Sequence, residues 1–254
     1  MNKNKLKQIE EVENKYLEKY YHFLKFVEDE LLFGFKTKQK IEKDWLDKYK
    51  SGISDFAVGA ERIVYSLLNG KGIGQPNSAP VGADLFFEVE DAFIHLDLKT
   101  VGASLIGKTN IGDYTKNIFV GTNQNSYKAE IKKANGEAFT PKRIYEPALP
   151  TFYNKGTKNE KICLSYFVTI LYDKDTLDTL VLCIACMPNG DLEPHYKSRV
   201  LQAGKLIDKT RFKFTEVSKF EFLENKDRIK VVYFNENMQE DYKKKLVFFE
   251  NLYK

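Results

Sequence analysis

The chain places two carboxylates and one ammonium group among apolar residues: Asp84, Asp97 and Lys99. In the run AFIHLDLKTV, residues alternate as they do on a β-strand with one buried face. Asp97 and Lys99 therefore project from the same face, about 6.5–7 Å apart at the backbone, and the aliphatic residues project from the other. Asp84 begins the preceding predicted strand. It becomes a neighbour of Asp97 if the two strands pair as a hairpin that turns at Glu90-Asp91.

These three side chains could catalyse one kind of reaction. Two neighbouring carboxylates repel each other unless a cation lies between them. Oxygen ligands on a partly open site suit Mg²⁺, which keeps several waters and accepts phosphate oxygens. A lysine beside them can orient or help to deprotonate a water and can stabilise negative charge on a phosphate. The residues therefore match the parts of metal-assisted phosphodiester hydrolysis.

The same residues resemble the PD-(D/E)xK nuclease motif that many type II restriction endonucleases share. The motif here consists of Asp84, a spacer of twelve residues, and Asp97-Leu98-Lys99. The proline that normally adjoins the first aspartate is Pro80 here, separated from it by Val81-Gly82-Ala83. The family commonly carries a glutamate on the helix before the hairpin, and FAVGAERIV supplies Glu61 in that place. By this resemblance, Asp84 and Asp97 bind Mg²⁺ and Lys99 serves the attacking water. Glu61 would assist the metal or the lysine.

An acid-x-lysine triplet alone is common in a chain this rich in lysine and glutamate. Glu130-Ile131-Lys132 also matches, but SYKAEIKKANGEAF is expected to form a short surface helix. Asp97 and Lys99 instead lie on a strand that follows a strand and a capped helix. The alternative is that they form a salt-bridged pair on the solvated face of an edge strand. Against it, a polar row of His95, Asp97 and Lys99 is costly unless something binds there.

The order of predicted elements indicates an α/β fold in which a mixed central β-sheet is flanked by helices, as in restriction endonucleases. Residues 1–50 are expected to form a helical N-terminal segment, which either packs on the main domain or contributes to a dimer interface. Residues 51–254 would form the catalytic α/β core, so that residues 1–254 make one nuclease domain. Later strands are predicted at NIFVGT, ICLSYFVTILYD, TLVLCIACMP and RIKVVYFNE, with a long loop at TPKRIYEPALPTFYNKGTKNEK and a closing helix at MQEDYKKKLVFFENLYK.

Composition limits the class of protein that this chain can be. With 43% hydrophobic and 30% charged residues the chain can bury a core, and its net charge of +4 permits DNA binding through a local patch. No apolar run is long enough to span a bilayer and the N-terminus resembles no secretion signal, so we expect a cytoplasmic protein. Cys183 and Cys186 fall on a predicted buried strand, where residues three apart point to opposite faces, and we interpret them as core cysteines.

Two polar segments are candidates for DNA contacts. Asparagine and glutamine can pair with adenine, and lysine with guanine or phosphate. In the segment after the catalytic strand the first candidates are Asn123, Gln124 and Asn125, followed by Lys108, Thr109 and Asn110. The alternative for each is an ordinary polar surface loop. The later predicted loop is basic with interleaved aromatic residues, namely Lys142, Arg143, Tyr153, Lys155 and Lys158.

Together these features predict a type II restriction endonuclease that hydrolyses double-stranded DNA at a specific sequence with Mg²⁺. The family resemblance implies 5′-phosphate and 3′-hydroxyl ends. Because a two-fold symmetric dimer matches a palindromic DNA site, we also expect a homodimer. The alternatives are a DNA repair nuclease of the same fold and a non-catalytic DNA-binding or interaction protein whose acidic and lysine residues are structural.

Overall fold

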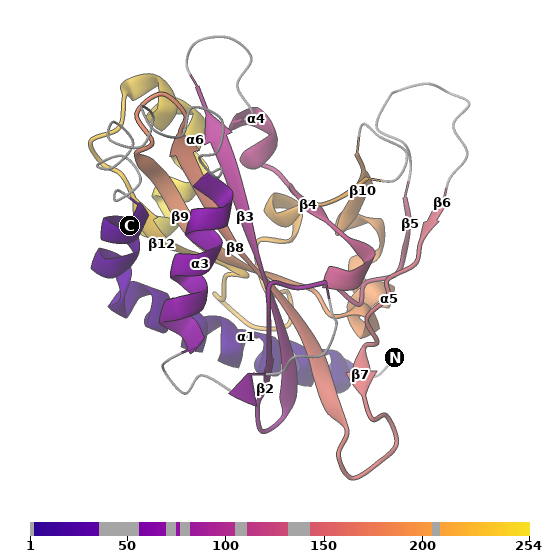
Figure 1. Cartoon of the computed structure of the whole chain (residues 1–254). Helices are drawn as coiled ribbons and strands as arrows, with labels where there is room; N and C mark the ends of the chain where they lie inside the picture. The colour runs from indigo at the N-terminus through magenta and orange to yellow at the C-terminus, as the bar shows by residue number, and fades with distance from the viewer. Residues whose placement is uncertain are drawn as a thin grey trace, which may run out of the picture.

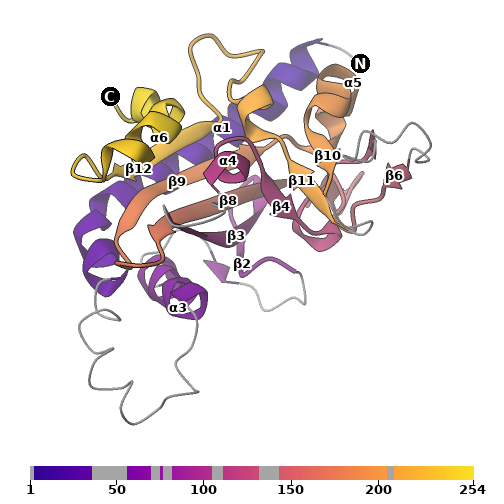
Figure 2. The ribbon, with the colours of Figure 1, turned by 90° about the horizontal axis from the view of Figure 1, so that it is seen from above.

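A central mixed β-sheet with helices on both faces forms the body of the protein (Figures 1 and 2). The computed structural model describes residues 3–35, 56–69, 75–76, 82–104, 111–131, 143–204 and 209–254. The spatial order of the sheet is β1-β2-β3-β8-β9-β12, with β7 beside β8. Its strands are β1 (Gln75–Pro76), β2 (Leu85–Glu88), β3 (Ala92–Ala103), β7 (Phe152–Tyr153), β8 (Lys161–Asp173), β9 (Thr179–Met187) and β12 (Ile229–Phe234).

The sheet is mixed because one pair of neighbours is parallel. β3 runs parallel to β8 over its whole length, whereas β2–β3, β8–β9 and β9–β12 are antiparallel. Both β8 and β9 are buried along nearly every residue, as expected of central strands that are covered on both faces. The predicted α/β class and mixed central sheet are thereby confirmed.

Helices α1 (Lys3–Phe26) and α3 (Phe56–Asn69) cover one face of the sheet. The helical conformation resumes over residues 28–35. Helix α1 of the N-terminal segment packs against β9 and β12, and residues 36–50 lie outside the described ranges. None of the helices in the described part of the chain combines the length and apolarity needed to cross a lipid bilayer.

A fully buried ion-pair network attaches α1 to the chain just before β12. Arg228 Nη1 lies 2.7 Å from Glu13 Oε2, and Arg228 Nη2 lies 2.9 Å from Glu10 Oε1. Glu13 Oε1 also accepts a hydrogen bond from the backbone of Asn189, and Tyr196 donates its hydroxyl to Glu10. Burial raises the pKa of Glu13 to about 7, although Arg228 opposes that shift. Removing one partner from such a network destabilises the fold strongly, because the remaining charge stays buried without a compensating charge.

The opposite face of the sheet carries a smaller sheet and two helices. The smaller sheet has the order β10-β11-β4, from β10 (Leu201–Ala203), β11 (Thr210–Phe212) and β4 (Ile118–Val120). Beside it lie α4 (Ile111–Tyr114) and α6 (Glu240–Tyr253), whose Tyr114 and Phe249 rings are 5.3 Å apart. Tyr114 also bonds Thr169 of β8 at 3.0 Å, so this layer is attached directly to the central strands.

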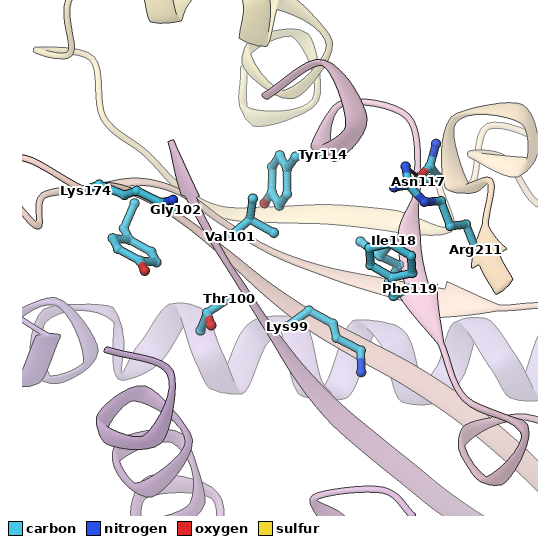
Figure 3. Close-up of a pocket in the computed structure, with 11 residues that line it drawn as sticks. Lys99, Thr100, Val101, Gly102, Tyr114, Asn117, Ile118, Phe119, Lys174 and Arg211 are labelled. Atoms are coloured by element: carbon cyan, nitrogen blue, oxygen red, sulfur yellow. Dashed lines mark hydrogen bonds between the residues drawn. The ribbon is translucent and has the colours of Figure 1, made fainter. Parts of the chain in front are cut away.

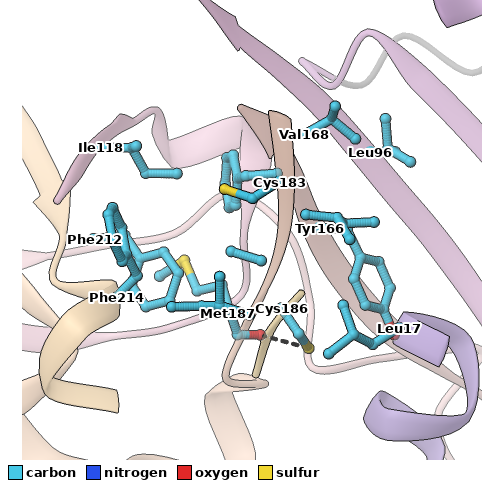
Figure 4. Close-up of a cluster of buried hydrophobic side chains, with 14 of the residues drawn as sticks. Leu17, Leu96, Ile118, Tyr166, Val168, Cys183, Cys186, Met187, Phe212 and Phe214 are labelled. Atoms are coloured by element: carbon cyan, nitrogen blue, oxygen red, sulfur yellow. Dashed lines mark hydrogen bonds between the residues drawn. The ribbon is translucent and has the colours of Figure 1, made fainter. Parts of the chain in front are cut away.

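Side chains from both layers meet on β8 and β9 (Figure 4). Tyr166 points toward α1, where its hydroxyl donates to the backbone of Glu13, and Phe167 points toward Phe212 of the smaller sheet. Cys183 and Cys186 are buried free thiols within β9, as predicted from the apolar run around them.

The remaining short elements include two that correct the sequence-based expectation. Residues 129–131, expected to be helical, instead form β5 (Ala129–Ile131), which pairs with β6 (Arg143–Tyr145) inside the predicted long loop. Tyr127, Ala129 and Ile131 are buried at every second position, and this two-residue period outweighs the helix propensity of the lysine and glutamate between them. The other short elements are α5 (Glu193–Tyr196) and the 3₁₀ turns η1 (Thr122–Gln124), η2 (Gly190–Leu192), η3 (Lys197–Arg199) and η4 (Phe214–Val217).

Candidate active site

The β2–β3 hairpin brings Asp84 beside Asp97. Leu85 pairs with Leu96, and one further step in the same register aligns Asp84 with Asp97. Asp84 Oδ2 also accepts the backbone N–H of Leu98 at 2.6 Å, so the carboxylate is bonded directly to β3. The hairpin register on which the sequence argument depended is therefore present in the structure.

Strand β3 separates an apolar face from a charged one. Ile94, Leu96 and Leu98 are buried against the helices on one side. Asp97 is 3% exposed on the other side, and Lys99 Nζ lies 2.5 Å from its Oδ1. No hydrogen bond of regular geometry reaches Asp97 Oδ1, so the ammonium compensates this buried oxygen by charge.

Three carboxylates and Lys99 influence one another electrostatically at this point. Burial raises the pKa of Asp97 to about 6; Lys99 opposes the shift, and Asp84 and Glu61 add to it. The pKa of Glu61, on α3, is raised by burial and by Asp84 and lowered by Lys99. Glu61, Asp84 and Leu98 also line one cavity of about 400 Å³. A cation would relieve the repulsion among these carboxylates.

The oxygen ligands at this point suit a metal ion that needs few protein ligands. Within the described ranges, no group of three or more histidine, cysteine, aspartate or glutamate side chains is close enough to enclose one ion. Mg²⁺ is commonly held by only one or two carboxylates, with waters and substrate phosphates completing its shell. The Asp84 and Asp97 carboxylates, one of which has an oxygen without a hydrogen bond, fit such an open site.

Gln124 makes contacts that the sequence did not predict. Its Nε2 donates to Asp97 Oδ2 at 2.5 Å, and its Oε1 accepts from Lys99 Nζ at 3.3 Å and from the Gly121 backbone N–H at 2.7 Å. The amide thus faces the carboxylate and the ammonium instead of lying free for a base. Gln124 lies 25 residues beyond Lys99 and belongs to no motif, so only the folded chain reveals this contact.

The two neighbours of Gln124 differ in accessibility. Asn123 is exposed and lies over Gly82, where an added Cβ would come within 1.7 Å of Asn123 Nδ2. Asn125 is fully buried; its Nδ2 donates to the Gly121 carbonyl and to Tyr145, and its Oδ1 accepts from a backbone N–H. The expected base contact at Asn125 is therefore corrected, because this amide is occupied inside the protein.

The other predicted DNA contacts are only partly described. Arg143 is half-buried, and its Nη2 donates to the backbone of Lys209 at 3.0 Å and to Thr210 at 2.9 Å. Lys155 and Lys158 are exposed on the turn before β8, at the opposite end of β3 from Lys99 (Figure 1). The remaining candidates lie outside the described residues: Lys108, Thr109, Asn110 and Lys142.

His95, the residue of the polar row that precedes Asp97, packs in an aromatic cluster. His95 is buried and stacks on Phe86 with ring centroids 4.5 Å apart. Its Nε2 forms a 3.0 Å hydrogen bond with the hydroxyl of Tyr153. Burial lowers the pKa of His95 to about 4, so the ring is neutral at physiological pH. His95 and Tyr153 thus stabilise the hairpin below the charged residues.

A cavity of about 440 Å³ opens beside Lys99 on the charged face (Figure 3). Lys174 and Arg211 line it together with Lys99, and no described lining residue is acidic. Arg211 lies 4.3 Å over the Phe119 ring, and its Nη1 donates to Asn117 Oδ1 at 2.9 Å. Cations grouped with aromatic walls favour an anionic ligand such as a nucleic-acid backbone.

A mixed sheet whose hairpin unites two aspartates and a lysine, with a glutamate on the preceding helix, defines a nuclease of the restriction-endonuclease class. The chain belongs to the family of the type II restriction enzyme MwoI: the model of its N-terminal domain matches residues 5–176, and that of its central domain matches residues 179–234. It is accordingly a site-specific endodeoxyribonuclease, and the non-catalytic and repair alternatives are set aside. The two matched regions meet in one sheet, because β8 pairs directly with β9.

Solved structures of two restriction endonucleases share the fold. BglI bound to its DNA recognition sequence has a TM-score of 0.64 and 14% identity, covering 91% of this chain and 93% of that chain. Tetrameric SfiI bound to cognate DNA has a TM-score of 0.63 and 14% identity, covering 92% of this chain and 87% of that chain. Comparison with curated protein sequences found no match.

Proposed function

We propose that this endonuclease hydrolyses double-stranded DNA with Mg²⁺ at Asp84, Asp97, Lys99 and Glu61, and leaves 5′-phosphate ends. The observation that carries the proposal is the register of the hairpin, which aligns Asp84 with Asp97 one step beyond the last strand pair, together with Lys99 Nζ 2.5 Å from a buried oxygen of Asp97. The raised pKa values of Asp97 and Glu61 support it, since carboxylates that repel one another favour a cation.

Each side chain has a distinct part in the proposed reaction. Asp84 and Asp97 would hold Mg²⁺, which when bound supplies positive charge that polarises the scissile phosphate. Lys99, whose side chain is 22% exposed, orients the attacking water and stabilises charge on the phosphate. Glu61, on α3, lines a cavity together with Asp84 and assists the metal or the lysine.

We further propose that DNA lies along the charged face of β3. Lys174 and Arg211, in the cavity beside Lys99, would contact its phosphates. Asn123, exposed near the hairpin, remains a proposed base contact, as do Lys108, Thr109 and Asn110, and Lys142 and Arg143 remain proposed DNA contacts. BglI and SfiI are each described in complex with DNA, and recognition of a palindrome would require a homodimer. We also propose a cytoplasmic location and a single nuclease domain; the pairing of β8 with β9 across the two matched regions supports the latter.

One assay tests the catalytic assignment. Plasmid and genomic DNA, methylated and unmethylated, are incubated with Mg²⁺ and the wild type, Asp97→Ala or Lys99→Ala. Glu224→Ala is the matched control, since Glu224 belongs to another acid-x-lysine triplet on an exposed turn. The wild type and the control should yield the same discrete fragments, and the two active-site variants should not. Cleavage by Asp97→Ala at the wild-type rate would refute the catalytic role of Asp97.

A further inference from the structure

We infer that Gln124 is a positioning residue that fixes the Asp97 carboxylate and offers the Lys99 ammonium a second acceptor. The inference rests on the proposed function of Asp97 and Lys99. It assigns to Gln124 a role in the active site in place of the base contact expected from its sequence position.

The orientation of the Gln124 amide follows from its partners. The Gly121 backbone N–H and the Lys99 ammonium can only donate, so both face Oε1. The ionised Asp97 carboxylate can only accept, so it faces Nε2. The positions of Oε1 and Nε2 are therefore fixed by their partners. Exchanging the two atoms would place a donor against the Lys99 ammonium and an acceptor against the Asp97 carboxylate.

A short turn with its own anchors holds Gln124 in this position. Gln124 ends the 3₁₀ turn η1, which follows β4 on the face opposite α1. Asn125, the next residue, is buried and donates to the Gly121 carbonyl at 3.0 Å and to Tyr145 at 2.8 Å. The Ala148 N–H bonds the Thr122 carbonyl at 2.7 Å. A turn bonded at both ends limits the freedom of the glutamine side chain.

The contacts give Gln124 two effects on catalysis. Its Nε2 occupies Asp97 Oδ2, which leaves Oδ1 as the oxygen that faces Lys99 and is available to a cation. If Oδ1 held a cation, Lys99 would need another acceptor, because a partly buried charge without one is costly. Gln124 Oε1, 3.3 Å away, supplies it. Lys99 can therefore leave Asp97 for the substrate while one hydrogen bond still guides it.

Two substitutions separate these effects. Gln124→Met keeps the length of the side chain and removes all three hydrogen bonds; we expect single-turnover cleavage and Mn²⁺ affinity each to fall about 10–100-fold, as for other residues that orient metal ligands. Gln124→Glu places a new carboxylate beside Asp97 and Lys99. It should bind Mn²⁺ at least as tightly as the wild type but still cleave about tenfold more slowly, since the new carboxylate retains the ammonium.

The experiment combines three measurements on the full-length protein. Single-turnover cleavage with Mg²⁺ reports the chemical step, electron paramagnetic resonance reports Mn²⁺ binding to the DNA-free protein, and metal-free titration reports DNA affinity. Gln8→Ala, at an exposed glutamine on α1, is the matched control and should behave as the wild type in all three. DNA affinity of Gln124→Met should stay within about twofold of the wild type, because Gln124 contacts only protein groups in this role.

The outcomes distinguish the possible roles of Gln124. Weaker metal-free DNA binding by Gln124→Met with unchanged Mn²⁺ affinity would identify a base contact and overturn the inference. Parallel loss of all three properties together with a lower melting temperature would identify a structural residue and overturn it as well. If the wild type fails to cleave DNA, or Asp97→Asn binds Mn²⁺ as well as the wild type, the proposed function itself fails. If the wild type cleaves DNA and binds Mn²⁺, and Gln124→Met does both equally well, the role of Gln124 is refuted and the proposed function stands.

Discussion

Replacing Asp97 with asparagine should abolish cleavage and yet stabilise the metal-free fold above about pH 6. Burial raises the pKa of Asp97 from 3.8 to about 6, with Lys99 opposing the shift. A carboxyl group whose pKa is higher in the folded state binds its proton more tightly there than in the unfolded chain. Its ionisation therefore destabilises the fold: the penalty is absent below pH 3.8, grows as the pH rises toward 6, and is complete above that value.

The magnitude follows from these two pKa values. The linkage relation gives a penalty of about 3 kcal/mol at pH 8, and of about 1.5 kcal/mol at pH 5, where most of Asp97 is protonated in the fold. Asparagine keeps the shape of the side chain and removes the charge. The free energy of unfolding of Asp97→Asn, relative to the wild type, should therefore rise by about 1.5 kcal/mol between pH 5 and pH 8.

Urea unfolding with EDTA at the two pH values measures this difference. Glu224→Gln, which removes one carboxylate from an exposed turn, is the matched control. Adding Mg²⁺ should then stabilise the wild type and leave Asp97→Asn unchanged, because a ligand stabilises only the state that binds it. A stability difference that is the same at pH 5 and pH 8 would refute the reasoning, since the substitution would then act through its contact with Gln124 and not through charge.

Three further predictions concern stability and DNA binding. Arg228→Met should lower the free energy of unfolding by about 3–5 kcal/mol, because it leaves two buried glutamates without their cation; a loss below about 1 kcal/mol in urea unfolding would contradict this account. Lys174→Ala should reduce the slope of log Kd against log salt by about 1 without changing the single-turnover rate at saturating DNA. Lys244→Ala, at an exposed lysine on α6, should leave that slope unchanged, and equal slopes for both variants would argue against a phosphate contact at Lys174. Asn125→Ala should destabilise the fold by about 1–3 kcal/mol, because it leaves the Tyr145 hydroxyl and the part-buried Gly121 carbonyl without their partner. The DNA recognition sequence, found by sequencing fragment ends, should stay the same, and a changed recognition sequence would restore Asn125 as a base contact.

The main strands were predictable because their side-chain pattern reflects the environment of each residue directly. The long apolar runs of β8 and β9 need two covered faces, and the alternation of β3 needs one apolar and one polar face. Shorter elements give too few residues for a period to be seen. Strands β10 and β11 have three residues each and were not predicted. For β5, local helix propensity pointed the wrong way, and burial at alternate residues decided the conformation.

The candidate active site also has one part that a local sequence pattern predicts and another part that it does not. A two-residue period places Asp97 and Lys99 on one face of a strand whatever the strand packs against, so this pair could be predicted from the local sequence. The other features of the site depend on how distant segments pack: Asp84 lies opposite Asp97, Gln124 bonds both members of the pair, and Asn125 is buried. These relations join residues through strand register and turn anchoring across many positions in the chain. Such relations depend on packing energies summed over the whole molecule, which no local pattern contains.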